Sequence, residues 1–266
     1  MTDEAAGEIW VGRKAEMTRL RDALRARESL LLWGPADAGK TALARRVVRE
    51  LPAEQCKAFL FWSGPGSRHD LLQHLICQVF AAGSPQMNAK VHADGCSEMD
   101  FGRWIRKQPS RRLRGILQST LKQEKYWIFI DHIPPLTHPM ARLVKDLIWR
   151  CETPVYALAR GYSPHEIGYA WSLYWTDRYR LPLGPLPATD AAALAQACLR
   201  ESGLSRRERA GFQAAVMHLS GRLPGAIVKM CSMAALPRYQ HAGQIKTKLL
   251  RVDYLMGMQG YPIQNA

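Results

Sequence analysis

The sequence predicts an α/β fold, with a parallel sheet sandwiched by helices and followed by a small α-helical domain. Two observations support this prediction. Through the first two thirds of the 266-residue chain, short apolar segments alternate with helical patterns, which is typical of a parallel sheet covered on both faces. Beyond residue 183 the patterns are helical. We therefore expect an α/β core over residues 1–183 and a helical domain over residues 184–266.

The expected strands are short apolar runs bounded by glycine, proline or charged residues. They cover residues 29–33, 57–62, 127–130 and 154–160, and the expected helices between them cover residues 42–51 and 68–81. The stretch at residues 82–125 resembles an insertion, because it begins loop-like and then becomes strongly basic.

The helical domain should begin with a turn and a helix opened by Thr189 or Asp190. Further helices are expected near residues 205–219, 224–235 and 243–257. One stripe of the last helix is apolar and consists of Ile245, Leu249, Val252 and Leu255 or Met256. Because such a stripe is typical of a buried helix face, we expect it to pack on the helical domain or on a neighbouring subunit.

A phosphate-binding loop follows the first strand. Residues 34–41 read GPADAGKT, and a helical segment begins directly after them. This order of strand, G-x-x-x-x-G-K-T and helix is a P-loop, whose backbone N–H groups face nucleotide phosphates. Lys40 should reach the β- and γ-phosphates, and Thr41 should offer its hydroxyl to Mg²⁺. The residues expected to contact the nucleotide here are Gly34, Pro35, Ala36, Asp37, Ala38, Gly39, Lys40, Thr41 and Ala42.

An acid at the end of the third strand completes the expected ATP and Mg²⁺ site. In YWIFIDHIPP, residues 126–135, four largely apolar residues run into Asp131. Such an acid holds the coordination shell of the metal together with Thr41. The fourth strand ends in Arg160. Because ligands bind at the carboxyl ends of parallel strands, the P-loop, Asp131 and Arg160 should converge there.

Four segments resemble the AAA+/STAND group of P-loop ATPases, and in particular its origin-recognition-like members. WVGRKAEMTRLRDAL at residues 10–24 resembles the opening of that group, and SGRLPGAIVKMC at residues 220–231 resembles the G-x-P segment of its helical lid. GPADAGKT corresponds to the Walker A motif and WIFID to the Walker B motif. The resemblance implies a P-loop NTPase core with a small helical lid.

The resemblance also implies roles for single residues. Val11 and Gly12 would border the adenine, Arg160 would sense the γ-phosphate, and Pro224 would mark the lid helix at the nucleotide. Arg160 could instead be a surface residue, and Pro224 could be a first-turn helix proline whether or not it also marks the site. The candidate catalytic residues are Lys40, Asp131, His132 and Arg160.

Two departures from that group favour a switch over a fast motor. His132 stands where motors of the group carry a glutamate that polarises the attacking water, and an imidazole differs from a carboxylate in geometry and basicity. Gly225 stands where many relatives have an arginine that touches the γ-phosphate. We therefore expect slow hydrolysis, with His132 either a base or a packed strand-end histidine.

The net charge of +14 indicates polyanionic partners, with nucleic acid first and an anionic membrane surface second, unless it serves solubility alone. Basic residues gather in one segment, where Pro109 and Ser110 should separate two helices and Ser110 should cap the second. Trp104 should be buried rather than stacked on a base. The cations expected at a DNA backbone are Arg103, Arg106, Lys107, Arg111, Arg112 and Arg114, although a solvated face is the alternative.

Two classes of function fit these features. The first is an ATP-dependent switch that associates with DNA, forms a homo-oligomer and recruits a protein partner, similar to small AAA+ regulators of transposition. The second is a STAND-type switch that acts only through protein partners. In oligomers of this group an arginine of one subunit reaches the neighbour's γ-phosphate, and the candidates are Arg142, Arg150 and Arg178.

The remaining features favour a soluble, cytoplasmic protein. The six cysteines are scattered without a CxxC pair, and no apolar run reaches the ~20 residues that span a bilayer. The chain ends soon after the predicted lid. We therefore expect its output to come from partners or from oligomerisation.

Overall fold

The structure is a computed structural model, and contacts divide the chain into two compact units. The described residues are 9–56, 58–64, 66–133 and 136–258. The α/β unit comprises Ala15–Pro35 and Lys40–Leu183, and the helical unit comprises Met1–Lys14, Ala36–Gly39 and Gly184–Ala266. The chain thus passes between the units four times, and the tip of the predicted P-loop belongs to the helical unit.

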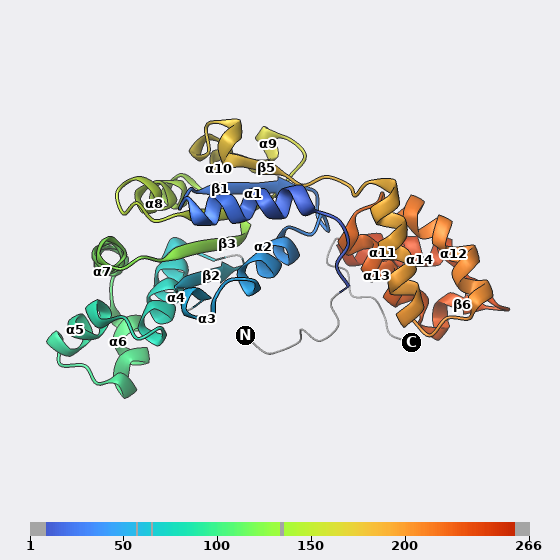
Figure 1. Cartoon of the computed structure of the whole chain (residues 1–266). Coiled ribbons are helices and arrows are strands. Elements are labelled where there is room, and N and C mark those ends of the chain that lie inside the picture. Colours follow the sequence, from blue (N-terminus) through green and yellow to red (C-terminus); the bar gives the residue numbers. More distant parts are fainter. Residues whose placement is uncertain (1–8, 57, 65, 134–135, 259–266) are drawn as a thin grey trace. The chain divides into compact units, whose positions relative to one another are not determined.

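The α/β unit is built on a five-stranded parallel sheet (Figure 1). Its strands are β1 (Leu30–Gly34), β2 (Phe59–Ser63), β3 (Trp127–Ile133), β4 (Val155–Arg160) and β5 (Arg180–Pro182), in the order β2-β3-β4-β1-β5. β4 therefore separates β1, which leads into the P-loop, from β3, which carries Asp131. The sheet confirms the predicted α/β class, and β5 is a short strand that the apolar pattern did not reveal.

Apolar and aromatic packing makes this sheet a firm platform. The three leucines at residues 30–32 are fully buried. Across β2, β3 and β4, rings stack in one row: Phe61 on Phe129, with centroids 5.0 Å apart, and Phe129 on Tyr156, with centroids 4.7 Å apart. Burying one such side chain contributes about 1.5–3 kcal/mol. The carboxyl ends of the strands are thereby held in fixed positions.

Helices pack around the sheet (Figure 1). They are α1 (Lys14–Arg25), α2 (Lys40–Arg49), α3 (Ala53–Cys56), α4 (Arg68–Ala81), α5 (Pro85–Ala93), α6 (Phe101–Lys107), α7 (Ser110–Gln123), α8 (His138–Trp149), α9 (Pro164–Ile167) and α10 (Tyr169–Leu173). The predicted helix at residues 68–81 has these bounds because a capping box between Ser67 and Asp70 fixes its start.

The first part of the stretch 82–125 is helical, so the prediction of a loop there is wrong. The helix is α5, whose first turn contains Pro85. The Ser84 hydroxyl caps it by accepting a hydrogen bond from the Met87 N–H over 3.0 Å. Serine followed by proline is the sequence signal that marks this helix start.

The predicted cap at Ser110 is also wrong. Helix α7 already includes Ser110, Pro109 is its N-cap residue, and the Ser110 hydroxyl lies 2.9 Å from Nδ1 of His69 instead. The reason is that a proline just before the helix fixes the extended backbone that an N-cap residue needs. Trp104 is buried as predicted, and its Nε1 donates to Asp94.

The helical unit has its own core. Its elements are α11 (Ala188–Glu201), α12 (Arg206–Leu219), α13 (Pro224–Ala234), a hairpin of β6 (Gln240–His241) and β7 (Gln244–Ile245), and α14 (Thr247–Met258). Buried Leu194, Phe212 and Ile227 join three of these helices. The hairpin shortens the last helix relative to its predicted start at residue 243.

The structure corrects the prediction about the start of this unit and tests part of the prediction about its last helix. α11 begins at Ala188 after Pro187, so Thr189 and Asp190 lie inside its first turn instead of opening it. On α14 the buried core residues are Leu250 and Tyr254, and Met258 packs against the same core while partly buried. Of the predicted stripe, Ile245 packs against this core, whereas four residues are 39–52% exposed: Leu249, Val252, Leu255 and Met256. Their packing on a neighbouring subunit stays a prediction. In the described part of the chain, no helix has the length and apolar character needed to cross a bilayer.

Candidate functional site

The P-loop is shaped by its two glycines. At Gly34, φ is +151° and a Cβ would lie 2.0 Å from the carbonyl oxygen of Leu183, so a side chain does not fit. At Gly39, φ is +85°, a conformation that side chains rarely adopt. Lys40 opens α2, and its Nζ donates to the carbonyl groups of Gly34 and Pro35 over 2.9 and 2.7 Å. The ammonium charge that the loop can offer to a phosphate is thereby held beside the loop backbone.

Thr41 and Asp131 come together although 90 residues separate them. The Thr41 hydroxyl donates to Oδ2 of Asp131 over 2.7 Å. Asp131 is 9% exposed, and its Oδ1 accepts the backbone N–H of His132 over 2.8 Å. Hydroxyl and carboxylate oxygens are ligands that suit Mg²⁺. The two residues therefore fit the metal site predicted for them.

His132 lies on a bulge of β3. The register of β3 against β4 shifts between Ile130 and Ile133, and His132 has a left-handed φ of +53°. Its side chain is 59% exposed, and its Nδ1 lies 3.2 Å from Oδ1 of Asp131. His132 is therefore not a packed strand-end histidine. Bulges re-aim side chains beside functional sites, and this one turns the imidazole out of the core.

Arg160 ends β4 and lies opposite Gly34 in the register of β1 and β4. The N–H of Gly161 donates to the Gly34 carbonyl over 3.2 Å, and the Arg160 side chain is exposed. This position beside the P-loop fits the predicted sensor role, which stays a prediction.

The tip of the P-loop is held inside the helical unit. Asp37 has a φ of +60°. Its carboxylate accepts hydrogen bonds from Nζ of Lys229 over 2.8 Å and from the hydroxyl of Tyr254 over 2.7 Å. The Gly225 N–H donates to the Asp37 carbonyl over 2.8 Å. Asp37 therefore connects the loop to both α13 and α14.

The first turn of α13 closes around this tip. Pro224 is in the first helical position, so the first-turn proline interpretation is confirmed, and its Cγ would lie 3.2 Å from a Cβ placed on Gly39. A Cβ on Gly225 would lie 2.9 Å from the Asp37 Cβ. A side chain at position 225 would therefore crowd Asp37.

The N-terminal segment also lies in the helical unit. Val11 packs against its core, and a Cβ on Gly12, at φ +74°, would lie 2.4 Å from Oδ2 of Asp190. Arg13 is buried, and its guanidinium donates to the carbonyl groups of Ala38 and Gly184. The adenine contacts predicted for Val11 and Gly12 stay predictions.

Sequence reasoning missed three residues of this region: Arg13, Lys229 and Tyr254. Their contacts with the P-loop join positions 25, 192 and 217 residues apart. The VGR motif contained Arg13 without showing that its side chain turns back to the loop. No local pattern marks Lys229 or Tyr254.

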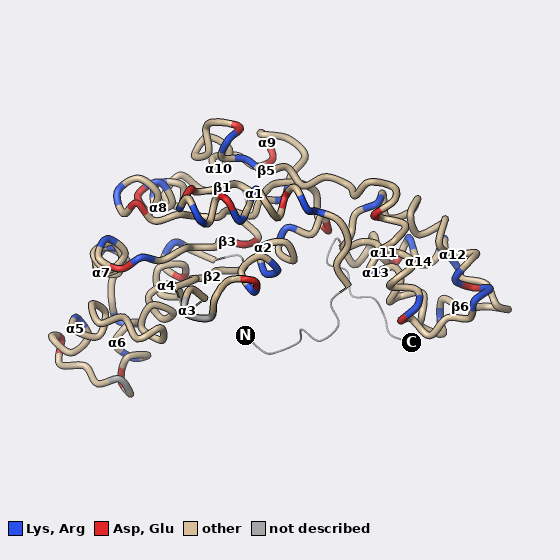
Figure 2. The backbone as a smooth tube through the Cα atoms, viewed as in Figure 1, with Lys and Arg blue, Asp and Glu red and all other residues tan. Residues whose placement is uncertain are grey.

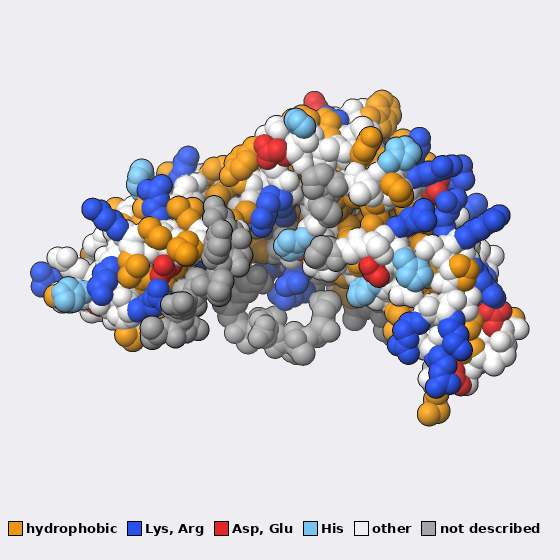
Figure 3. Space-filling model, turned by 180° about the vertical axis from the view of Figure 1, so that it is seen from behind, with side chains coloured by type: hydrophobic (Ala, Val, Ile, Leu, Met, Phe, Trp, Pro, Cys, Tyr) orange, Lys and Arg blue, Asp and Glu red, His pale blue; other side chains and the backbone are white. Residues whose placement is uncertain are grey.

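The basic segment at residues 103–114 is partly neutralised. Arg103, Arg112 and Arg114 form ion pairs with Asp100, Asp94 and Asp146. Arg106, Lys107 and Arg111 are exposed and make no ion pair with any residue that the structure describes. Figures 2 and 3 show further Lys and Arg residues spread over other elements. Half of the predicted DNA-binding cations thus remain available to a phosphate backbone.

The three candidate trans-acting arginines differ in their surroundings. Arg178 forms an ion pair with Glu28, and Arg150 forms one with Asp146 at 3.2 Å. Arg142 is exposed. Arg142 and Arg150 line a cavity of about 500 Å³ between α8 and α10, together with the half-exposed rings of Trp149 and Tyr169.

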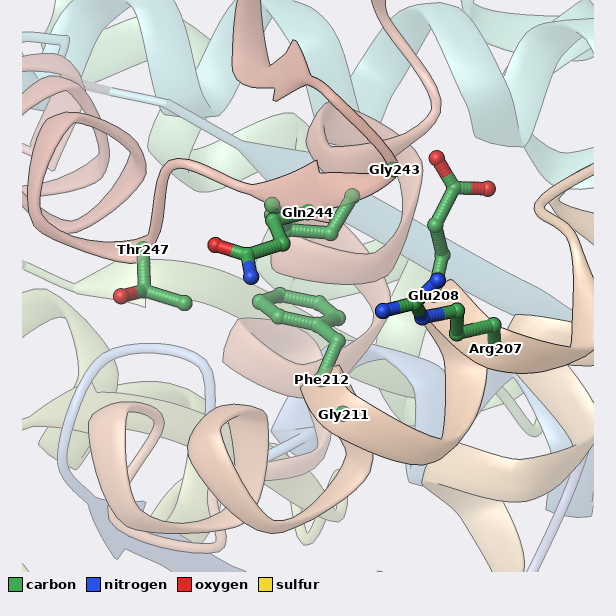
Figure 4. A pocket seen from close by; sticks show the side chains of 8 residues that line it. Arg207, Glu208, Gly211, Phe212, Gly243, Gln244 and Thr247 are labelled. Carbon is green, nitrogen blue, oxygen red and sulfur yellow. The ribbon is translucent and has the colours of Figure 1, made fainter.

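A second cavity, of about 300 Å³, lies in the helical unit between α12 and the β6–β7 hairpin (Figure 4). Its lining includes Arg207, Phe212, Gln244 and Thr247. None of the site residues predicted from the sequence lines it, so it is separate from the predicted nucleotide contacts.

Comparison with known proteins shows the family and the fold of this chain. The family described as "AAA ATPase domain" matches residues 9–212. The fold is similar to the Walker-type ATPase of Pyrococcus abyssi, at 14% identity and a TM-score of 0.60 over 94% of this chain and 74% of that one. It is also similar to a signal transduction ATPase with numerous domains (STAND) from Pyrococcus horikoshii that has a tetratricopeptide repeat sensor, at 16% identity and a TM-score of 0.52.

The second likeness covers 86% of this chain and 30% of the other protein. No curated protein matches the chain. At these identities, the two structures show a shared fold and nothing further.

Proposed function

Because the chain belongs to the AAA ATPase domain family, as its sequence motifs indicated, we propose that it is an ATP-binding switch with slow hydrolysis that associates with DNA. In this proposal, it oligomerises to recruit a protein partner. The proposed nucleotide binding is supported most directly by the 2.7 Å hydrogen bond between Thr41, the last residue of the P-loop, and Asp131. These are the two residues that hold Mg²⁺ in such sites.

The residues of this site have different roles in the proposed mechanism. Lys40 and the N–H groups of the P-loop bind the phosphates, and Thr41 and Asp131 hold Mg²⁺, which neutralises charge on the β- and γ-phosphates. Arg160 senses the γ-phosphate from the end of β4. His132 stands beside Asp131 with an exposed imidazole, which supports a base with a geometry unlike that of a glutamate. Slow turnover follows, so that the bound nucleotide defines a lasting state.

DNA association is supported by the charge of +14 and by the available cations of α6 and α7. Arg106 and Lys107 come from α6, and Arg111 comes from α7. Contacts of this kind read the phosphate backbone without sequence preference.

Oligomerisation with a protein partner is supported by the cavity between α8 and α10. Exposed Trp and Tyr next to arginine are the side chains that dominate protein interfaces, and Trp149, Tyr169 and Arg142 provide them here. Arg142 is the candidate to act on a neighbour's γ-phosphate, because Arg150 and Arg178 already have carboxylate partners. We place this switch in the cytoplasm.

The alternative is a STAND-type switch that acts only through protein partners. The ion pairs of Arg103, Arg112 and Arg114 favour it, because a neutralised face has less attraction for DNA.

The test mixes the protein with duplex DNA in the presence of ATP, ADP or no nucleotide. DNA affinity, oligomer size and phosphate release are measured together. We expect DNA-bound oligomers with ATP only, an affinity that falls steeply with salt, and slow turnover. ATP binding without any DNA response would instead support the protein-only switch.

Lys40→Ala should remove these responses, with ATP affinity reduced on the order of 100-fold, because the phosphates lose a charge-assisted partner. Lys122→Ala, at an exposed lysine of α7 outside the predicted sites, is the matched control. Unchanged ATP affinity in Lys40→Ala would contradict the site assignment.

A further inference from the structure

The P-loop contains an acid where it is expected to bind an anion. Asp37 lies at the centre of GPADAGKT, and its side chain is only 13% exposed. A carboxylate in this loop is expected to repel bound phosphates, because like charges repel each other. The loop therefore needs a counter-charge at this position.

Two side chains of the helical unit supply donors to this carboxylate. Lys229 of α13 donates to Oδ1 over 2.8 Å, and the hydroxyl of Tyr254 of α14 donates to Oδ2 over 2.7 Å. Each carboxylate oxygen thus has its own partner, and the positive charge of Lys229 balances the negative charge of Asp37.

The backbone fixes the same geometry. The Gly225 N–H donates to the Asp37 carbonyl over 2.8 Å, and Lys229 follows Gly225 by one helical turn on the same face of α13. The first turns of α13 therefore contact the loop tip through both the Gly225 backbone and the Lys229 side chain. Asp37 keeps its left-handed φ of +60° within this set of contacts.

We propose that Lys229 is a positioning residue of the nucleotide site, which acts by neutralising Asp37 and so keeps the P-loop receptive to phosphate. This inference rests on the nucleotide binding proposed above. It assigns to the helical unit a direct share in ATP affinity. It also predicts that the requirement for Lys229 disappears when Asp37 no longer carries a charge.

The test is a double-mutant cycle on ATP affinity, measured by titration calorimetry. Lys229→Met should weaken ATP binding about tenfold, equivalent to about 1.4 kcal/mol. Asp37→Asn should bind about twofold to threefold more tightly than the wild type, because a repulsive charge is removed while Lys229 stays. The double variant should recover to within about threefold of the wild type, so the two effects are strongly non-additive.

Three further variants separate charge from fold. Lys248→Met removes the same charge from an exposed position of α14, and it should leave the ATP affinity unchanged. Tyr254→Phe removes one hydrogen bond and should cost about threefold. Lys229→Arg should retain most of the affinity, because it keeps the charge. Thermal unfolding of each variant shows whether the helical unit remains folded.

Two results would overturn the proposal. If Lys229→Met and the double variant bind ATP equally weakly, Lys229 contacts the nucleotide itself and does not act through Asp37. If Lys229→Met binds like the wild type, the ion pair has no role in the site. A wild-type protein that fails to bind ATP would instead contradict the proposed function.

Discussion

Two regions of the candidate site each hold a non-glycine residue in a left-handed backbone conformation, Asp37 at φ +60° and His132 at φ +53°. The side chain of Asp37 is 13% exposed, and its two carboxylate oxygens accept hydrogen bonds from Lys229 and Tyr254. The His132 side chain is 59% exposed and faces its neighbour Asp131.

The difference shows two ways to maintain the same strained conformation, which costs about 1–2 kcal/mol. At the P-loop tip, contacts with α13 and α14 hold Asp37 in place. At the strand bulge, the buried side chains of Ile130 and Ile133 on either side anchor the backbone, so the imidazole itself is not needed. Loss of the side chain should therefore lower the stability of the protein at Asp37 and change it little at His132.

The largest expected effect exploits this tolerance at the bulge. His132→Glu should raise the rate of ATP hydrolysis on the order of 100-fold, because a carboxylate at this position can act as general base. His132→Gln, of matched size, should show no increase. Phosphate release under single-turnover conditions measures the hydrolysis rate of each variant. Equal rates for His132→Glu and His132→Gln would contradict a catalytic position for residue 132.

A smaller effect is expected at the loop tip. Gly225→Ala places a Cβ 2.9 Å from the Asp37 Cβ, and overpacking of this kind costs about 1–3 kcal/mol. Thermal unfolding should show a lower midpoint, and ATP affinity should fall with it. Gly211→Ala, where a Cβ meets no atom within 4 Å, is the matched control. A midpoint unaffected by Gly225→Ala would show that the loop and α13 can separate at little cost.

The smallest effect compares the two strained residues directly. His132→Gly should raise stability by no more than about 1 kcal/mol, or about 2–4 °C in midpoint, since glycine adopts positive φ without steric cost. Asp37→Gly relieves the same strain but loses the partners Lys229 and Tyr254, so its midpoint should fall. Calorimetry measures the unfolding midpoint of both variants. A midpoint of Asp37→Gly above that of the wild type would remove the distinction between the two regions.

The sequence predicted the parts of the fold and site whose signals are local. The P-loop, Asp131 and the helix at residues 68–81 each lie within one continuous pattern of strand, turn or helix. The contact between Thr41 and Asp131 followed from a topological rule, because the carboxyl ends of parallel strands share one edge.

The missed features depend on long-range packing. Helix α14 has apolar residues on more than one side, so its periodicity could not show that Leu250 and Tyr254, and not Val252 and Leu255, face the core. Similarly, Lys229 looked like any solvated lysine. Its role as partner of Asp37 exists only once α13 is placed against the loop.

The four crossings of the chain between its two units have a consequence for the order of folding during synthesis. Ala15–Pro35 and Lys40–Leu183 can form their sheet as soon as they leave the ribosome. The segment with Val11 and Arg13, and the loop tip with Asp37, must wait for Gly184–Ala266. We therefore expect the tip of the phosphate-binding loop to take shape late, although it precedes Gly184–Ala266 in the chain. A fragment that begins at residue 184 would lack both segments, and with them the packing of Val11 on its core and the carboxylate that Lys229 and Tyr254 contact.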